Sequence, residues 1–415
     1  MWTRHKETIC LIDGRIKKGE AAMKYTVACC FLTHNHKDVI EDVLDKCLEK
    51  YLEHGFDVCI CDDSDDSETE MMIRQRIKKG YVNLFYVDMQ SAINGDDKLL
   101  RVIKGDCLPK EYDYVWPCKD RVCFAEEYLD RLCYMIDQGY DIIQGIQDDN
   151  RAYVKRDTYS DPVEFYRDYA FCTTNWEATI QRRSTMLFSI EDEKKIENIG
   201  VDAANSFNQM LSVFWGLYYK ENPVVGVCPY MHGERYISQV GTGSSWKKKD
   251  TMYSLWIDKW VAANYNLPDI YNPYKAAAIK KETNQMELFG SLEWMIYYRE
   301  NGLFDYDVFK KYKDMWAYLT DIPLQWLELV AMGEYKAVKE MAFMEFENTF
   351  KEEEYYQGYC LFSTNSWFSQ IYNEKDYRIL TRCFVKYKDD ILATGGSHVF
   401  DGVRSVEDLL EQYRD

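Results

Sequence analysis

The sequence predicts an α/β fold, a parallel sheet with crossover helices, followed by a helical region. From Lys24 to about Tyr271, short apolar runs rich in β-branched residues alternate with longer amphipathic stretches. Alternation of this kind is typical of parallel sheets whose strands are joined by helices. After Pro268 and Pro273 the pattern changes to helical periodicity with few turn signals, so we expect helices over residues 272–415.

The first unit of the α/β region is a strand, a helix and a second strand. Residues 26–32 and 58–61 are apolar and stop at polar residues, as strands buried on both faces do. Between them, apolar residues recur at spacings of three and four over residues 39–52, which predicts an amphipathic helix. Asp38 is the expected N-cap of this helix, and Gly55 is the expected terminator.

The same alternation continues through the rest of the α/β region. A helix is expected at residues 124–138, and the expected strands are residues 81–88, 112–116, 140–144, 177–181 and 224–229. The chain of 415 residues exceeds the size of about 250–300 residues at which single hydrophobic cores stop growing. We therefore expect two domains, at residues 24–271 and 272–415, after a charged N-terminal extension at residues 1–23.

Composition limits the classes of partner. The formal net charge of -19 argues against broad binding of DNA or RNA, which requires a basic face. The 14 cysteines follow no zinc-binding spacing and the charged N-terminus does not resemble a secretory signal, so we expect reduced thiols in a cytoplasmic protein. No apolar stretch approaches the roughly 20 residues that span a bilayer, so any membrane contact would be peripheral, at the inner face.

Polar residues follow the two strands of the first unit. Residues 33–36 (Thr-His-Asn-His) come after the first strand, and residues 62–66 (Asp-Asp-Ser-Asp-Asp) come after the second. Ligands of open parallel sheets lie beyond the carboxyl ends of the strands, so these segments should converge on one crevice, a candidate nucleotide site. The alternative is that Asp62 and Asp63 only cap a helix that starts near Ser67.

A third segment completes a recognisable order of motifs. Residues 111–124 contain a short strand, Tyr-Asp-Tyr-Val-Trp, that leads into Lys119-Asp120-Arg121 and then a helix. The order of Thr-x-Asn, Asp-Asp-Ser and this segment resembles family 2 glycosyltransferases of GT-A fold, over about residues 24–235. The resemblance implies a Rossmann-like nucleotide-sugar domain and an inverting enzyme that transfers a sugar from a UDP-sugar to a hydroxyl acceptor. It also implies a role in the synthesis of a bacterial surface glycan or glycoconjugate.

The resemblance implies roles for several of these residues. In the family, the residues that match Thr33 and Asp63 contact the uracil and ribose of the donor. A carboxylate can accept a hydrogen bond from the uracil imide, and a hydroxyl can donate to a carbonyl. The further nucleotide-binding candidates, from the same segments and from the interval that follows, are Asn35, Asp62, Asp120, and Lys98 or Arg101 near the diphosphate. A solvated helix face is the alternative for the last two.

The chain departs from the family at the metal-binding motif. The family normally has Asp-x-Asp or Asp-Asp there to bind Mg²⁺ or Mn²⁺, whereas Arg121 stands at the position of the key aspartate. One carboxylate between two cations is a poor site for a hard divalent ion. Three interpretations stay open: Lys119 and Arg121 stabilise the departing UDP without a metal, Asp120 holds a metal together with distant carboxylates, or Asp120 merely pairs with its neighbours at a surface turn.

The expected general base is an acidic residue after a glycine and ahead of a helix. Asp202 in the segment 198–207 matches, although Val201 separates it from the glycine. A helix N-cap is the alternative role for Asp202. Asp148 and Asp149 are rival bases or substrate contacts, and His232 could contact the diphosphate or the acceptor.

Two other classes of function remain as alternatives. A nucleotidyltransferase would carry a glycine-rich loop after the first strand, and residues 33–38 contain no glycine. The missing acidic pair suggests a catalytically inactive module that binds nucleotide sugars. The expected partners of the enzyme are a nucleotide-sugar donor and a glycan, lipid-linked or protein acceptor. The helical region could bind the acceptor, pair subunits into a homo-oligomer or approach the membrane.

Overall fold

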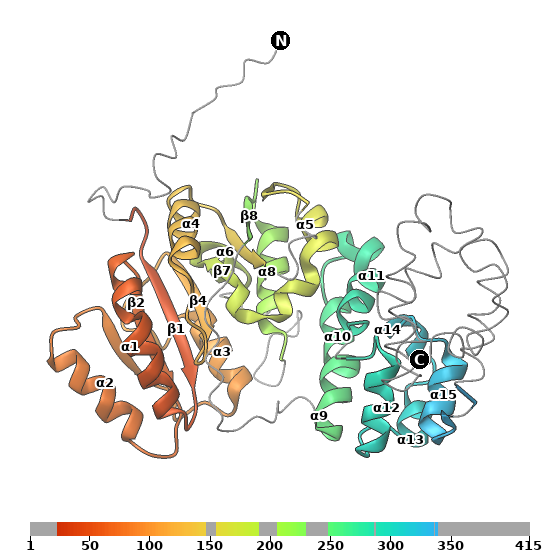
Figure 1. Cartoon of the computed structure of the whole chain (residues 1–415). Coiled ribbons are helices and arrows are strands. Elements are labelled where there is room, and N and C mark those ends of the chain that lie inside the picture. Colours follow the sequence, from red (N-terminus) through yellow and green to blue (C-terminus); the bar gives the residue numbers. More distant parts are fainter. Residues whose placement is uncertain are drawn as a thin grey trace, which may run out of the picture.

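The computed structural model describes residues 23–146, 155–190, 206–229, 248–285, 288–335 and 337–338. It contains an eight-stranded sheet of order β3-β2-β1-β4-β7-β5-β8-β6 (Figure 1). The strands are β1 (Val27–Thr33), β2 (Asp57–Asp62), β3 (Leu84–Asp88), β4 (Tyr114–Lys119), β5 (Ile142–Ile146), β6 (Thr158–Tyr159), β7 (Thr179–Arg182) and β8 (Val225–Pro229).

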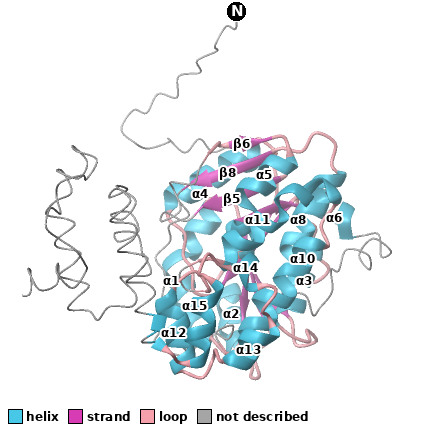
Figure 2. Cartoon of the chain, turned by 90° about the vertical axis from the view of Figure 1, so that its right-hand side faces the viewer, coloured by secondary structure: helices cyan, strands magenta, loops and turns pink. Residues whose placement is uncertain are grey.

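Helices cover the sheet and form a second group at one end of it, as the two views in Figures 1 and 2 show. The helices beside the sheet are α1 (Lys37–Glu53), α2 (Glu68–Lys78), α3 (Gly95–Lys104), α4 (Glu126–Asp137), α5 (Pro162–Tyr169), α6 (Arg183–Ile190) and α8 (Asn208–Tyr219). The helices of the second group are α9 (Lys249–Tyr253), α10 (Trp260–Tyr265), α11 (Asn272–Thr283), α12 (Leu292–Glu300), α13 (Tyr306–Lys311), α14 (Trp316–Leu319) and α15 (Leu324–Met332).

The first four strands are parallel and contain a change of direction. Strand β1 pairs with β2 on one side and with β4 on the other, and β2 pairs with β3. The chain therefore moves outward from β1 through β2 to β3, and then returns to the opposite side of β1 for β4. The carboxyl ends of β1 and β4 flank the resulting topological switch point, where ligands of open α/β sheets bind.

Strand β1 is buried along its whole length because helices pack on both of its faces. Cys29 and Phe31 belong to one hydrophobic cluster with the apolar stripe of α1. Cys30 and Leu32 belong to another cluster with the apolar residues of α3. Successive residues of a strand point to opposite faces, so the continuous apolar run seen in the sequence reflects a strand inside a three-layer arrangement.

Helix α1 ends as the sequence predicts and begins two residues earlier than expected. Gly55 has a φ of 80°, and the N–H groups of Gly55 and Phe56 donate to the carbonyls of Leu52 and Tyr51, both at 3.0 Å. This is a Schellman ending, which favours glycine at the left-handed position. The N-cap residue is His36 rather than Asp38, which lies in the first helical turn.

The predicted α/β class and the helices that follow it are confirmed. The expected strand at 112–116 begins two residues later, at Tyr114, and continues to Lys119. The expected strand at 177–181 is β7, which pairs antiparallel with both β4 and β5. Of the expected helical domain, residues 339–415 lie outside the described residues, as do residues 1–22 of the expected N-terminal extension.

The sheet and the second group of helices share one hydrophobic cluster. It includes Ile142 of β5, Val227 of β8 and Phe214 of α8 together with Trp316 of α14. The Tyr271 hydroxyl donates to the carbonyl of Phe214 at 3.0 Å, close to the position where the sequence pattern changes. The helices after residue 248 therefore pack on α5 and α8, which lie beside the part of the sheet that contains β5, β8 and β6. No helix among the described residues has the length and apolarity to cross a membrane.

One pair of cysteines differs from the expectation that all thiols are reduced. Cys47 of α1 and Cys123, in the segment after β4, form a disulfide with their Cα atoms 6.1 Å apart. That separation lies inside the ordinary range for disulfides. Spacing along the sequence could not reveal the pair, because a separation of 76 residues carries no pairing signal.

Candidate active site

The ends of three parallel strands define the candidate site. In the sheet register Thr33 stands opposite Asp62, and Leu32 stands opposite Lys119. Lys119 is the last residue of β4 and Thr33 is the last residue of β1. Asp120 therefore lies beside Thr33 at the ends of these two strands. The segments named from the sequence meet at one edge of the sheet, and Asp120 and Thr33 lie on the two sides of the switch point.

Asp120 is held from several directions. Its Oδ2 atom accepts a hydrogen bond from the Thr33 hydroxyl at 3.3 Å and lies 2.5 Å from Nδ1 of His36. Nη2 of Arg121 lies 3.2 Å from Nε2 of the same histidine. A neutral His36 with its proton on Nδ1 satisfies both contacts, donating to Asp120 and accepting from Arg121. Asp120 is only 8% exposed, so it is a buried group of the switch point and not part of a surface turn.

Asp63 and Lys98 form an ion pair beside the same strand end. The Lys98 ammonium contacts Oδ1 of Asp63 and donates to the carbonyl of Thr33 at 2.7 Å. Lys98 is 4% exposed. Burial without a partner would penalise either charge, so each side chain of the pair offsets the cost of burying the other. Nδ1 of His34 lies 3.0 Å from the Asp63 carbonyl.

Arg101, the other basic candidate, lies on the next part of α3. Its guanidinium pairs with Asp97 at 3.0 Å and donates to the Ser91 hydroxyl at 2.7 Å. These contacts tie α3 to the loop that precedes it. Of the two basic residues named from the sequence, Lys98 is therefore the one that contacts the strand ends.

Asn35 and Asp62 organise the two loops. Asn35, in the left-handed region with φ of 55°, donates to the Asp65 carboxylate at 2.7 Å and accepts from the Asp65 N–H at 2.9 Å. Asp62 is fully buried and accepts from the Ser64 N–H at 3.0 Å and from the Tyr86 hydroxyl at 3.2 Å.

Helix α2 receives its cap from another residue of the acidic loop. The carboxylate of Asp66 accepts from the N–H of Glu68 at 2.9 Å. The alternative in which Asp62 and Asp63 cap this helix is therefore wrong.

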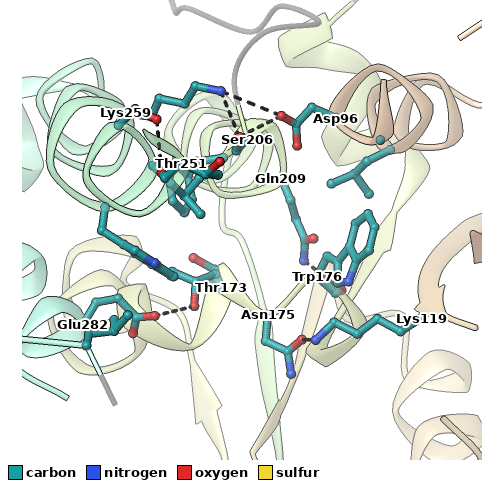
Figure 3. A pocket seen from close by; sticks show the side chains of 18 of the residues that line it. Asp96, Lys119, Thr173, Asn175, Trp176, Ser206, Gln209, Thr251, Lys259 and Glu282 are labelled. Carbon is teal, nitrogen blue, oxygen red and sulfur yellow. Dashed lines mark hydrogen bonds and ion pairs between the residues drawn. The ribbon is translucent and has the colours of Figure 1, made fainter. Parts of the chain in front are cut away.

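Lys119 points away from Asp120. Its ammonium donates to the Asn175 side chain at 2.8 Å and lies 3.6 Å from Oε1 of Glu177. Glu177 is almost fully buried, and its other carboxylate oxygen has no hydrogen-bond partner. Lys119 itself is 44% exposed and reaches the wall of a cavity of about 1010 Å³ (Figure 3).

The part of the cavity wall that is formed by helix α11 carries a buried carboxyl group. Glu282, at the end of α11, accepts from the Thr174 hydroxyl at 3.0 Å and from the Gln285 amide at 2.7 Å. Burial raises the pKa of Glu282 to about 8, because the charged form is costly to remove from water, and the hydrogen bond from Thr174 offsets only part of this cost. The group is therefore mostly protonated at neutral pH.

The described residues do not provide a suitable metal site. Among them, no group of three or more His, Cys, Asp or Glu side chains is placed to hold a metal ion. Asp120 is already bound by Thr33 and His36, and Nε of Arg121 lies 3.6 Å from its second oxygen. A hard divalent ion requires several oxygen ligands, so this donor set does not fit Mg²⁺ or Mn²⁺.

The structure brings together some of the residues named from the sequence and adds others. Thr33, Asp63, Lys98 and Asp120 meet at the switch point, with Arg121 beside them. Four of the named residues lie outside the described residues, namely Asp148, Asp149, Asp202 and His232.

His36, Glu177 and Glu282 were given no individual role from the sequence. His36 lies three residues after the end of β1, inside the segment 33–36 already expected at the crevice, so its position could have indicated it. Glu177 and Glu282 carry no local signal, because only the tertiary fold brings them to Lys119 and to the cavity.

Comparisons with known proteins found structural likenesses alone. No family model matches the sequence, and no curated protein matches it. Residues 1–349 of S. aureus TarS in complex with UDP-GlcNAc match with a TM-score of 0.39 and 13% identity, over 63% of this chain and 72% of that chain. The mannosyltransferase PcManGT from Pyrobaculum calidifontis with GDP-Man and Mn²⁺ matches with a TM-score of 0.40 and 13% identity, over 71% and 84%.

A third structure is glucosyl-3-phosphoglycerate synthase from Mycobacterium tuberculosis in complex with Mg²⁺ and UDP. It matches with a TM-score of 0.38 and 10% identity, over 59% of this chain and 81% of that chain. Because all three TM-scores are below 0.5, we draw no conclusion about this chain from the ligands or activities of these proteins.

Proposed function

We propose that this protein is an inverting glycosyltransferase that transfers a sugar from a UDP-sugar to a hydroxyl group of an acceptor. The observation that supports this most directly is the contact between Thr33 and Asp120 at the topological switch point. The motifs that resemble family 2 glycosyltransferases thus meet where an open α/β sheet binds nucleotides. The fold alone does not define a reaction, so the proposal depends on these side chains.

The donor nucleotide would bind at the ends of β1 and β2. Asp63 pairs with the Lys98 ammonium, and a carboxylate oxygen can accept a hydrogen bond from the imide N–H of uracil. The Thr33 hydroxyl can donate to a uracil carbonyl or a ribose oxygen by giving up its contact with Asp120, which is long at 3.3 Å. Asn35 and Asp62 would act by fixing the two loops and not by touching the nucleotide.

The diphosphate would lie against the cations that flank Asp120. The Arg121 side chain is 33% exposed and lies beside Asp120, so it can reach a ligand in the crevice. The Lys119 side chain is 44% exposed, and its ammonium would join Arg121 only by leaving its contacts with Asn175 and Glu177. Preorganised charges that face a developing anion often stabilise the transition state more than any other single effect. We assign the stabilisation of the departing UDP to Arg121, with Lys119 as a second cation that would turn from Glu177 when the diphosphate binds, since the described donor set does not fit a divalent ion.

The transfer step needs one base and one leaving group. The acceptor hydroxyl gives its proton to a carboxylate, and its oxygen bonds to the anomeric carbon of the donor sugar. The bond from that carbon to the diphosphate breaks, and its electron pair leaves with UDP, which inverts the anomeric centre. Asp202 is the proposed base, with Asp148 and Asp149 as rivals and His232 as a contact to the acceptor or the diphosphate.

The biological setting follows from the same resemblance. We place the enzyme in the cytoplasm, with any membrane contact peripheral at the inner face. The acceptor would be a growing bacterial surface glycan, a lipid-linked saccharide or a glycoprotein. The helical region after residue 271 would bind the acceptor or pair subunits.

The test is release of UDP by the full-length protein from a panel of UDP-sugars, with and without a strong chelator. We expect turnover with at least one donor, and its loss in Asp202→Asn. A matched control is Asp106→Asn, which makes the same change at an exposed position. Tight UDP binding without turnover would show that the protein is a nucleotide-sugar-binding module and not an enzyme. Pyrophosphate release from a nucleoside triphosphate would indicate a nucleotidyltransferase.

A further inference from the structure

The cavity of about 1010 Å³ beside Lys119 is lined largely by residues outside the sheet. It is lined by residues of α3, the end of β4, residues 173–176, the start of α8, residues 251–259 and the end of α11. Figure 3 shows side chains from these segments around the same space. The cavity is at the upper end of the range of about 300–1,000 Å³ that is usual for ligand pockets, so it has room for more than one sugar ring.

The charges on the cavity wall compensate one another. The Lys259 ammonium lies 4.0 Å from the Asp96 carboxylate, and the Ser206 hydroxyl contacts both, at 3.2 Å and 2.7 Å. Lys119 faces the buried Glu177. Burial raises the pKa of Glu282 to about 8, which leaves this carboxyl neutral at pH 7. The wall thus carries no uncompensated charge among the described residues, and it favours an uncharged ligand over an anionic one.

Gln209 lines the cavity and carries a side-chain acceptor without a hydrogen-bond partner. Its Nε2 group donates to the carbonyl of Trp176 at 3.0 Å, which fixes the orientation of the side chain. Its Oε1 atom is buried without a hydrogen-bond partner, and the residue is 2% exposed. Buried polar atoms are rarely left unpaired, so this carbonyl indicates a missing donor such as a ligand hydroxyl.

Two indole rings complete the wall. Trp176 and Trp256 both line the cavity and are partly buried. An aromatic ring offers a flat apolar surface on which the C–H face of a pyranose can stack. The polar groups beside the ring can bind the hydroxyl groups of the sugar. A carboxylic acid such as neutral Glu282 can both donate to and accept from a sugar hydroxyl.

We propose that this cavity binds a neutral saccharide, with the Gln209 carbonyl and the Glu282 carboxyl as its polar contacts and Trp176 as a stacking surface. The identification of this saccharide as the acceptor of the transfer rests on the proposed function. Saccharide binding itself rests on the cavity alone. An acidic sugar or a sugar phosphate would bring a charge that the wall does not neutralise, and it is excluded by the same reasoning.

The experiment is calorimetric titration of the full-length protein at pH 7. The neutral probes are maltose, cellobiose, lactose and N,N′-diacetylchitobiose, and the anionic probes are glucuronic acid and glucose 6-phosphate. We expect saturable binding of at least one neutral disaccharide, and at least tenfold weaker binding of both anionic probes. Gln209→Leu should weaken the neutral saccharide at least tenfold. Gln138→Leu, the same change at the exposed C-cap of α4, should leave it unchanged.

A second variant guards against a folding defect in Gln209→Leu. Trp176→Leu removes the proposed stacking surface and should also weaken the saccharide at least tenfold, with the thermal unfolding of both variants followed by circular dichroism. The assignment is overturned if no neutral probe binds, if an anionic probe binds more tightly, or if both variants bind like the wild type.

Titration with UDP in the same protein separates the two proposals. Saccharide binding without UDP binding would leave the cavity assigned and remove the glycosyltransferase. Transfer activity without saccharide binding would overturn the cavity assignment alone. Gln209→Leu should bind UDP as the wild type does, because Gln209 makes no contact with the ends of β1 and β2 among the interactions of the described residues.

Discussion

The hydroxyl group of Thr33 lies 3.3 Å from a carboxylate oxygen of Asp120, although the two residues are 87 positions apart in the chain. They meet because β1 and β4 are neighbouring parallel strands, and both strands end at the same edge of the sheet. The contact therefore depends directly on the order of the strands in the sheet. A sheet in which β4 lay elsewhere would separate these residues, and with them the proposed site.

The first prediction concerns Arg121 and the metal. We expect UDP release to persist in a strong chelator and to fall about 100-fold or more in Arg121→Ala, the usual effect of removing one group that stabilises a developing anion. Arg74→Ala, at an exposed position of α2, is the matched control. Complete loss of activity in the chelator, with recovery on addition of Mn²⁺, would refute the cationic mechanism.

The second prediction concerns the ion pair of Lys98 and Asp63. Lys98→Met leaves a partly buried carboxylate without its cation, and should lower the free energy of unfolding by about 3 kcal/mol. The double variant Lys98→Met/Asp63→Asn should recover part of this loss, because no unpaired charge remains. Urea unfolding measures both effects. Arg101→Met, whose pair is more exposed, should cost under about 1 kcal/mol.

The third prediction concerns recognition of uracil. Asp63→Asn replaces one acceptor oxygen with a donor group and should weaken UDP binding about tenfold or more, the equivalent of roughly 1.4 kcal/mol. Asp106→Asn should bind UDP as the wild type does. Calorimetric titration measures both. An unchanged affinity for UDP in Asp63→Asn would show that the uracil ring binds elsewhere in the crevice.

The sequence indicated the strands that carry the site better than the contacts within it. Continuous apolar runs such as that of β1 report burial on both faces, and polar residues mark where a strand ends. The place of β7 between β4 and β5 could not be predicted, because β7 follows β5 in the chain and pairs antiparallel with both neighbours. Sequence order does not determine which edge a late strand joins.

The same limit applies to individual side chains. Thr33 and Asp63 were accessible to prediction because they follow strands directly, whereas the partner of Asp63 lies on α3 and was one of two basic candidates. Glu282 reaches the cavity from a helix that starts after the sheet is complete. Neither its burial nor its protonation has a signature in the residues around it.

The fourth prediction concerns the disulfide of Cys47 and Cys123. Alkylation of the unfolded protein without reductant should modify two cysteines fewer than alkylation after reduction, as intact mass spectrometry would show. The double variant Cys47→Ala/Cys123→Ala should lose about 4 kcal/mol of stability, as the chain-entropy model gives for a loop that joins residues 76 apart. Alkylation of all cysteines without reductant would show that the two thiols are reduced.

The last prediction concerns Glu282 and pH. Burial raises the pKa of its carboxyl from the ordinary value of 4.5 to about 8 in the folded protein. Between these two values the unfolded chain has lost the proton that the folded chain still binds. The contribution of Glu282 to stability is therefore fully present below about pH 4.5, decreases as the pH rises, and is lost once the pH passes about 8.

The size of this effect is set by one proton, which gives a slope of roughly 1.4 kcal/mol per pH unit between the two pKa values. Glu282→Gln cannot ionise, so its free energy of unfolding should fall less steeply between pH 5 and pH 8 than that of the wild type. Urea unfolding across this range measures the difference. Gln285→Leu removes a neighbour of Glu282 and keeps the ionisable group, so the slope should remain. Parallel curves for the wild type and Glu282→Gln would show that the carboxyl is ionised in the folded protein, and the cavity would then carry a negative charge.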